Sequence, residues 1–435
     1  MRILVAGSGP AGLMVGATLA RRGHEVICVD RDPGPDGDEW HRRGVMQFTH
    51  AHNFRPQVAQ FLQAQWPEAH DAWLALGAET ISIPGFDDPT AKGVFSRRST
   101  FERALRQTAT QQPGLTLRTG HVDSLVEDDS TVSGVRIDGE VVSADLVVDA
   151  SGRSGRVTGR HDPELDGECG LAYVDRAYML RPEAEPGPMN APVGFIGDYD
   201  GYQCLIFPHE RGHFSVVIVR PTHVPELKAL RHVQAFDAAA RAIPDLAAWT
   251  DPRRCQPTSG VQMGGALRNV YRSQDGRPGL VAVGDSVATT TPTRGRGVAM
   301  TCMQVSALLE LLDDGADPVS IAKPFGMWCD AHMEPWVADH IAIDEGAARR
   351  WRGEDIDLDR PLTSDLIAAA IPADPRIGQY AFGYFTMTEL PESLRPAEPW
   401  ARAAYETGWR SPFDKGPHGA ELLDIVRTSA PGATV

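Results

Sequence analysis

The sequence predicts an α/β protein: a parallel-sheet domain, an inserted antiparallel sheet and a C-terminal helical segment. Three observations lead to this architecture. The first thirty residues alternate strand, glycine-rich turn, helix and strand. Between about residues 170 and 264 the pattern changes to short alternating strands. From about residue 325 the apolar residues follow a helical spacing that prolines interrupt.

The N-terminal stretch carries the most specific signal. An apolar run, Ile3 to Ala6, leads into Gly7, Gly9 and Gly12, which have the G-x-G-x-x-G spacing. The first glycine allows a tight turn, the second lets the backbone approach a pyrophosphate, and the third lets the helix pack on the strand. The next apolar run ends at Asp30, about 20 positions on, where an acid accepts hydrogen bonds from ribose hydroxyls. The context predicts a dinucleotide site.

Composition restricts the class of protein. A chain of 435 residues is expected to form two or three lobes. The net charge of −16 argues against nucleic acid or an anionic membrane as a partner. No window of about 20 apolar residues predicts a membrane span. Six cysteines without a C-x-x-C pair favour reduced, buried thiols in a cytoplasmic protein.

The elements that follow can be placed in order. A helix is expected over residues 58–76 with a break at Trp66-Pro67, then short strands at 80–86 and 93–96. Ser99 or Thr100 is the expected cap of the next helix. Four short sheet strands are expected between residues 115 and 143. His50 and His52 are interpreted as polar residues at a helix entry, because no further ligands complete a metal site.

Two later stretches resemble sheet-end motifs. A buried strand ends in Asp149-Ala150-Ser151-Gly152-Arg153, where the acid is expected to order the turn. Another strand ends in Gly284-Asp285, and Pro292, Gly295 and Gly297 precede a long helix. The N-terminus of that helix is a second candidate for a phosphate or a ring system. The last dozen residues are expected to fray.

Taken together, the three motifs resemble those of the FAD-dependent monooxygenases of the aromatic-hydroxylase type. That superfamily also holds olefin epoxidases and geranylgeranyl reductases. The resemblance covers about residues 1–320. The matching positions are Gly7, Gly9, Gly12 and Asp30; Arg98 with Glu102; Asp149 to Arg153; Gly284-Asp285; Pro292, Gly295 and Gly297; and the loop from Arg43 to Gln47.

The resemblance implies a Rossmann-like FAD-binding domain with an inserted antiparallel β-sheet substrate domain and a C-terminal helical segment. The expected limits are 1–75, 98–170 and 265–325 for the FAD-binding domain, 76–97 and 171–264 for the substrate domain, and 326–435 for the helical cap.

The same resemblance implies that FAD is the cofactor and that NAD(P)H reduces it, either as a transient visitor or through a partner flavin reductase. The expected cofactor contacts are Gly7, Gly9, Gly12, Asp30, Arg98, Asp285, Gly295 and Gly297. The implied reaction captures O2 as a flavin C4a-hydroperoxide and transfers one oxygen atom to an apolar or aromatic small molecule, such as a natural-product intermediate. No metal is implied.

Four residues are the candidate catalytic positions: Arg43, Gln47, Pro292 and Arg296. Arg296 departs from the Gly-Gln-Gly found in many members, and a cation there would raise the flavin potential or bind an anionic substrate group if it points inward. A tryptophan halogenase would carry a Trp-x-Trp-x-Ile-Pro signature, which the chain lacks.

Two other interpretations stay open. One is a flavin reductase or dehydrogenase that moves hydride without inserting oxygen, and the other is a flavoprotein whose FAD is structural. No second G-x-G-x-x-G provides a pocket for NAD(P)H. That absence fits both a transient nicotinamide visitor and a supply of reduced FAD by a partner.

Overall fold

The computed structural model describes residues 1–37, 39–42, 44–83, 92–153, 155, 157, 162–274 and 276–431. Its centre is a five-stranded parallel sheet in the order β18-β9-β1-β2-β5. The strands are β1 (Arg2–Ala6), β2 (Glu25–Asp30), β5 (Leu115–Thr119), β9 (Leu146–Asp149) and β18 (Leu280–Ala282). The predicted fold class, α/β with a parallel sheet, is confirmed.

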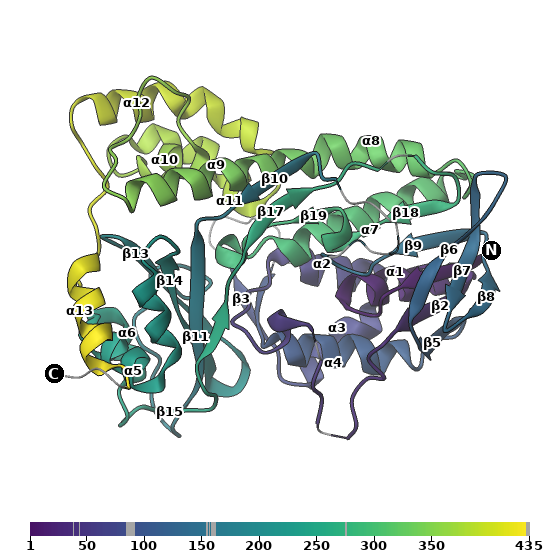
Figure 1. The fold of residues 1–435 in the computed structure, drawn as a ribbon, viewed down its shortest axis with the longest axis horizontal. Helices are drawn as coiled ribbons and strands as arrows, with labels where there is room; N and C mark the ends of the chain where they lie inside the picture. The colour runs from purple at the N-terminus through teal and green to yellow at the C-terminus, as the bar shows by residue number, and fades with distance from the viewer. Residues whose placement is uncertain are drawn as a thin grey trace.

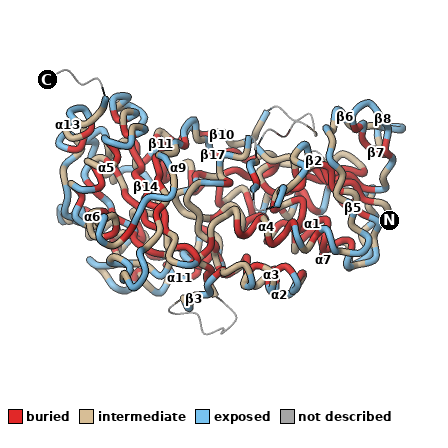
Figure 2. The backbone as a smooth tube through the Cα atoms, turned by 90° about the horizontal axis from the view of Figure 1, so that it is seen from below, coloured by how far each residue is buried: buried red, intermediate tan, exposed pale blue. Residues whose placement is uncertain are grey.

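Both faces of this sheet are buried, which explains the uninterrupted apolar runs in its strands. Ile3 and Val5 point into a core shared with α1 (Pro10–Arg21), α4 (Arg98–Ala109) and α7 (Gly297–Asp313). Leu4 points to the other face, into a core with the antiparallel sheet of β6 (Val122–Asp128), β7 (Thr131–Ile137) and β8 (Glu140–Ser143). Figure 2 shows buried residues along both α1 and the strand β2.

A second, antiparallel sheet lies at the other end of the molecule (Figure 1). Its strands run in the order β12-β13-β14-β11-β15, and β16 pairs with β11 beside this path. The bounds are β11 (Leu171–Leu180), β12 (Phe195–Tyr199), β13 (Tyr202–Pro208), β14 (His213–Pro221), β15 (Cys255–Pro257) and β16 (Gln262–Gly264). The helices α5 (Val233–Ala242) and α6 (Pro244–Thr250) pack on this sheet in one core.

Shorter elements join the two sheets. They are α2 (Pro56–Gln65), α3 (Pro67–Ala75), the hairpin β3 (Glu79–Ser82) and β4 (Lys92–Phe95), and the small sheet of β10 (Leu165–Glu168), β17 (Arg268–Tyr271) and β19 (Ala288–Thr289). The break at Trp66-Pro67 is confirmed, because Pro67 starts α3. The predicted strand over 80–86 ends at Ser82, and residues 84–91 lie outside the described part.

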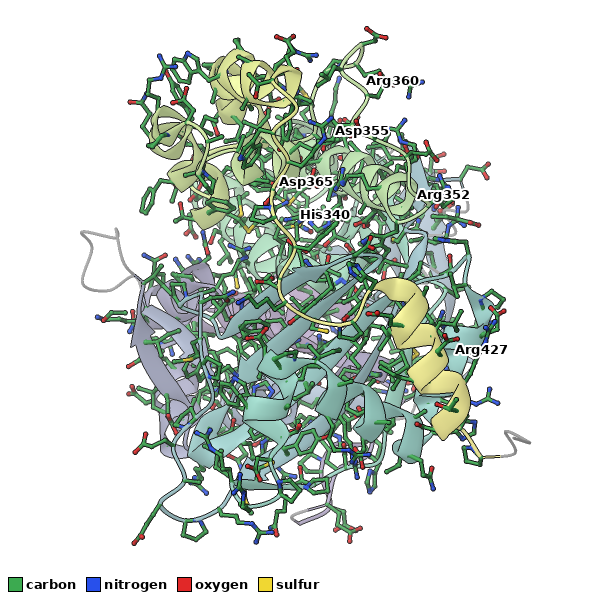
Figure 3. The ribbon with its side chains drawn as sticks, turned by 90° about the vertical axis from the view of Figure 1, so that its left-hand side faces the viewer. His340, Arg352, Asp355, Arg360, Asp365 and Arg427 are labelled. Atoms are coloured by element: carbon green, nitrogen blue, oxygen red, sulfur yellow. The ribbon has the colours of Figure 1, made fainter. Side chains whose placement is uncertain are left out.

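The C-terminal helices form a layer along the upper side of the molecule in Figure 1, above the antiparallel sheet at one end and above α7 at the other. They are α8 (Ala322–His332), α9 (Glu334–Arg350), α10 (Ser364–Ala369), α11 (Gly378–Thr386) and α12 (Glu398–Glu406). The final helix, α13 (Gly419–Ser429), leaves this layer and packs beside α5, where Leu422 and Val426 are buried. Figure 3 shows Arg427 on α13, away from Asp355 and Asp365 in the helical layer.

Two local predictions were wrong. Residues 424–429 do not fray, because they belong to α13, whose apolar side is covered by the core of the antiparallel sheet; residues 432–435 lie outside the described part. Neither Ser99 nor Thr100 caps α4, which starts at Arg98 without a side-chain cap. The Thr100 hydroxyl instead donates to Glu210 Oε1 over 2.5 Å. In both cases the local sequence pattern was overridden by a contact with residues that are distant in sequence.

Within the described residues, no helix is long and apolar enough to cross a bilayer. All six cysteines are buried and free of disulfides. Burial raises the pKa of the Cys28 thiol to about 12, so this thiol stays protonated at neutral pH. The predicted domain limits stay a prediction.

Candidate functional site

The glycine loop after β1 requires its glycines at two positions. Gly7 has φ of +107°, and a Cβ there would lie 2.4 Å from the Ala150 carbonyl oxygen. A Cβ on Gly12 would lie 1.9 Å from the Gly7 carbonyl oxygen. A Cβ on Gly9 would have Arg42 Nη1 as its nearest neighbour, at 3.7 Å, so the space in front of Gly9 is open. The loop is therefore packed tightly behind and open at Gly9, as the approach of a pyrophosphate requires.

The helix α1 starts directly behind this loop, with Gly9 as its N-cap and no side-chain cap. Its first N–H groups have no partner within the helix and carry the positive end of the helix dipole. This arrangement can bind phosphate.

Asp30 lies at the end of β2 and is tied to the glycine loop. One of its oxygens accepts a hydrogen bond from Ser8 N (2.7 Å), and the other accepts from Asp32 N (3.0 Å). Arg42 Nη2 lies 3.3 Å from Oδ2 of Asp30. A carboxylate has about four acceptor positions, so capacity for a ribose hydroxyl remains.

Arg42 joins three acids beside the glycine loop. It contacts Asp32 (3.0 Å) and Glu102 (2.5 Å) in addition to Asp30, and its side chain is only 5% exposed. Burial lowers the pKa of Arg42, but Glu102 and Asp30 outweigh this and raise it. The sequence did not single out Arg42. The predicted Arg43 lies outside the described residues.

The middle and late motifs meet at the ends of β9 and β18. The prediction that Asp149 orders its turn is confirmed, because Asp149 Oδ1 accepts a hydrogen bond from Ser151 N (2.9 Å). Ser286 connects the two motifs, accepting from Gly152 N (3.1 Å) and donating to Gly152 O (3.2 Å). These contacts bring the two predicted motifs to one edge of the parallel sheet.

Asp285, the predicted cofactor residue of the late motif, lies in the same region. Burial raises the pKa of Asp285, and the positive charges of Arg98 and Arg153 act in the opposite direction. Arg98 is also held by Glu102, its Nε lying 2.6 Å from Oε1. Arg98 thus acts electrostatically on Asp285, although the two residues are far apart in sequence.

The start of α7 contains the remaining predicted cofactor residues. Pro292 is exposed in a short turn, Gly295 adopts a left-handed conformation (φ +60°), and Gly297 is the first residue of α7. A Cβ on Gly297 would meet nothing within 4 Å. Arg55 holds this turn by donating to the carbonyl oxygens of Arg294 (2.7 Å) and Gly295 (3.2 Å).

Arg296 points into the C-terminal helices. Its side chain is 2% exposed, and Nη1 lies 3.0 Å from Asp339 Oδ2. The guanidinium lies 4.4 Å from the ring centre of Trp336 and 4.7 Å from that of Tyr384. These contacts join α7 to α9 and α11. A role of Arg296 toward flavin or substrate stays a proposal.

Asp344, on α9, gives a testable pH dependence near this junction. Burial raises its pKa to about 6, against the opposing hydrogen bond from Asn269, which is 2.7 Å long. The unfolded chain releases this proton near pH 4, so stability falls between about pH 4 and pH 6 and is constant above. We expect Asp344→Asn to raise the free energy of unfolding by up to about 3 kcal/mol relative to the native protein at pH 7, and to leave it unchanged at pH 4. Urea unfolding at both values measures this, and an equal change at both would contradict it.

A recess of about 360 Å³ is lined in part by Arg42, the residue nearest to Gly9 of the glycine loop. Its lining includes His41, Arg42, Met46, Phe48, His50 and Gln262. It lies between the loop that precedes α2 and the strand β16, at the junction of the two sheets. The predicted Gln47 is half-buried in the same loop but is not among the lining residues.

His50 and His52 differ from the expectation of helix-entry polar residues, since neither side chain is on the surface. His50 Nδ1 contacts Asp175 Oδ1. His52 is half-buried with its Nε2 covered, and desolvation lowers its pKa well below the usual value, with Arg98 acting in the same direction. The one signal in the sequence was Asp175, an acid in the middle of an apolar strand. Within the described residues no cluster of three or more His, Cys, Asp or Glu is placed to hold a metal.

The family model described as "Tryptophan halogenase" matches residues 95–337, more than half of the chain. The chain belongs to the tryptophan halogenase family. A second family model, "Lycopene cyclase protein", matches residues 2–166. The expectation that a missing Trp-x-Trp-x-Ile-Pro pattern excludes this family is wrong, because the family model matches more than half of the chain without it.

Curated relatives share part of the sequence with this chain, and solved structures share its fold. The menaquinone reductase of Mycolicibacterium smegmatis is 26% identical over 313 residues, which is 68% of this chain and 72% of the relative. Protein FixC of Escherichia coli O157:H7 is 28% identical over 156 residues, only 36% of its length. The flavin-dependent brominase Bmp2 has the same fold (TM-score 0.67, 15% identity, 94% of this chain and 100% of that chain).

A second structure comes from PqsL, a probable FAD-dependent monooxygenase from Pseudomonas aeruginosa (TM-score 0.60, 14% identity, 81% of this chain and 98% of that chain). This member of the tryptophan halogenase family is therefore an FAD-dependent oxidoreductase of the monooxygenase superfamily. The open glycine loop, the uncapped α1 and the acid at Asp30 fit its cofactor, FAD.

Proposed function

We propose that the protein is an FAD-dependent monooxygenase that hydroxylates or epoxidises an apolar or aromatic small molecule, such as a natural-product intermediate. The observation that carries the proposal is the recess of about 360 Å³, which shares Arg42 with the dinucleotide loop. Its size suits a small organic ligand, since such pockets span about 300–1,000 Å³. Bound FAD supplies the redox chemistry, taking electrons from NAD(P)H and activating O2.

The residues of the chain divide this work among them. Gly9 and the N-terminus of α1 hold the pyrophosphate, and Asp30 holds the ribose. Asp285 and the start of α7 at Gly297 hold the region near the ring system, and Arg98 balances the charge of Asp285. The apolar side chains of the recess wall, among them Met46 and Phe48, contact the apolar part of the ligand.

Halogenation of an electron-rich ring is the second candidate, and the match to the tryptophan halogenase model favours it. Oxygen transfer and halogenation both start from reduced flavin and O2, so the two candidates make the same demands on the dinucleotide site. They differ in the atom that reaches the substrate.

Hydride transfer without oxygen insertion is the third candidate, and the relationship to a menaquinone reductase favours it. Such an enzyme would reduce a carbon–carbon double bond anaerobically, and O2 would only drain its electrons into H2O2.

A product experiment separates the three candidates. The holoenzyme is reduced with NADPH or supplied with externally reduced FAD. It is then incubated with ¹⁸O₂, bromide and a panel of phenols, indoles and olefins, and a parallel sample is kept anaerobic. The masses of the products are measured by mass spectrometry. We expect one ¹⁸O atom in the product. A brominated product without ¹⁸O would establish halogenation, and a product two hydrogens heavier under anaerobic conditions would establish the reductase.

A further inference from the structure

We propose that His50 and Asp175 form a proton-transfer dyad in the recess, and that the recess binds its ligand through a weakly acidic hydroxyl group of the phenol or enol type. The proposal rests on the proposed function, because it assigns the recess to the substrate. It names two residues that the three cofactor motifs do not include.

The dyad is built from a loop and a strand that are far apart in sequence. Nδ1 of His50 contacts Oδ1 of Asp175, and Ala51 N donates to the other oxygen over 3.3 Å. The side chains are 7% and 1% exposed. The ring of Tyr173 meets His50 edge-on, with the centroids 5.2 Å apart. The imidazole is thus fixed in orientation as well as in position.

The contact with Asp175 determines which nitrogen can take a proton. In the resting state that we propose, Asp175 is an ionised carboxylate, which only accepts hydrogen bonds, and the imidazole is neutral, so that Nδ1 carries the proton and Nε2 has a free lone pair. Among the residues that the structure describes, none forms a hydrogen bond with Nε2 of His50. His50 lines the recess, so this lone pair is available to a ligand there.

A second acceptor lies on the same side. Gln262 on β16 is paired directly with Asp175 on β11, and residues opposite each other in antiparallel strands project from the same face. Oε1 of Gln262 is buried and has no hydrogen-bond partner in the described part of the chain. A buried acceptor without a donor costs about 1–3 kcal/mol. The Gln262 oxygen is covered by protein atoms, so the acceptor that a ligand in the recess meets directly is Nε2 of His50, and a hydroxyl group donates to it.

The other titratable groups around His50 do not compete with it as the acceptor of the ligand's proton. Arg42 lines the recess but is bound by Asp30, Asp32 and Glu102. Burial, and next the charge of Asp175, raise the pKa of Tyr173 to about 12, while Arg153 and Arg98 act in the opposite direction. The Tyr173 phenol therefore stays protonated. His41 is the other titratable group on the recess wall.

The proposed step is a simple proton transfer. The ligand O–H bond breaks, both of its electrons remain on oxygen, and the proton forms an N–H bond at Nε2 of His50. The resulting imidazolium lies against the Asp175 carboxylate, which compensates its charge. The phenolate ring is richer in electrons than the phenol and reacts more readily with an electrophilic oxygen or halogen donor. No additional oxidant or reductant takes part.

The test is a binding experiment that needs no turnover. The oxidised holoenzyme is titrated with 4-nitrophenol and with its methyl ether, 4-nitroanisole, at a pH at which the free phenol is mostly protonated. Difference spectra distinguish bound phenolate from bound phenol. We expect the native protein to bind the probe as phenolate and to prefer it to the ether at least about tenfold.

Two variants separate proton transfer from a structural role. The amide nitrogen of asparagine takes the place of Nδ1, so His50→Asn keeps the contact with Asp175 but removes Nε2. We expect His50→Asn to lose the phenolate spectrum and about tenfold in affinity for 4-nitrophenol, with the affinity for 4-nitroanisole unchanged. We expect Asp175→Asn to bind the probe as phenol. His121→Gln, which breaks an exposed histidine–aspartate contact of 2.9 Å, is the control and should match the native protein.

The proposal is overturned if the native protein binds phenol and ether equally, or if His50→Asn retains the phenolate spectrum. FAD content and thermal unfolding of each variant show whether it is folded, and if Asp175→Asn does not fold, His50→Asn decides. If the phenolate-binding test fails but the enzyme turns over with O2, only the proposed dyad is overturned. Phenolate binding through His50 in a protein that never reacts with O2 would contradict only the proposed function.

Discussion

Gly12→Ala is expected to purify without flavin. The added Cβ would lie 1.9 Å from the carbonyl oxygen of Gly7, so the turn must move, yet Gly7 is itself packed against the backbone of Ala150. The movement displaces the N–H groups that receive the pyrophosphate. We expect FAD binding to weaken at least about 100-fold, which corresponds to about 2.8 kcal/mol. Titration of the apoprotein with FAD, followed by flavin fluorescence, measures this change.

Gly378→Ala is the matched control. Gly378 begins α11 with φ of −56°, and a Cβ there would meet nothing within 4 Å. Alanine also has the higher helix propensity. This variant should bind FAD like the native protein. A Gly12→Ala protein with affinity within about threefold of the native value, about 0.7 kcal/mol, would show that the pyrophosphate does not lie over this turn.

The second large effect concerns Arg296. Arg296→Met should lower the free energy of unfolding by about 3–5 kcal/mol, because it leaves the buried Asp339 carboxylate without its cation. The variant also loses the contacts of the guanidinium with Trp336 and Tyr384. Urea unfolding at pH 7 measures the loss, and we expect the double variant Arg296→Met/Asp339→Asn to recover part of it.

An exposed ion pair provides the comparison. Arg253 lies 2.6 Å from Asp251, a shorter contact than that of Arg296, but its side chain is 90% exposed. We expect Arg253→Met to cost less than about 1 kcal/mol. If Arg296→Met proved equally mild but shifted the flavin reduction potential, Arg296 would act on the flavin rather than on the packing of α7 against α9.

The sequence alone was sufficient for the features that depend on neighbours in the chain. The strand and helix around Gly7 and Gly12 follow from local spacing, and so do the acid at the end of β2 and the break at Pro67. The proximity of the middle and late motifs was also predictable, because they follow the parallel strands β9 and β18, which end at a common edge of the sheet.

The features that the sequence did not reveal are contacts between distant segments. No period along the chain shows that His50 meets Asp175, that Arg296 turns toward Trp336, or that α13 covers the core beside α5. Arg42 could not be singled out from the sequence, because a loop without regular structure gives no indication of which side chains face inward. An acid within an apolar strand, as at Asp175, is the kind of exception that marks such contacts in advance.

The most direct test of the central claim, that this FAD protein passes electrons to O2 in order to functionalise a substrate, follows the flavin itself. The holoenzyme is reduced anaerobically with NADPH, NADH or a chemical reductant until its absorbance bleaches, and air is then admitted with and without a phenolic ligand. We predict rapid reoxidation with O2 consumption, and less H2O2 per flavin when the ligand is present, because the ligand receives the oxygen. Reoxidation that depends on an unsaturated acceptor and not on O2 would contradict the account and identify a reductase.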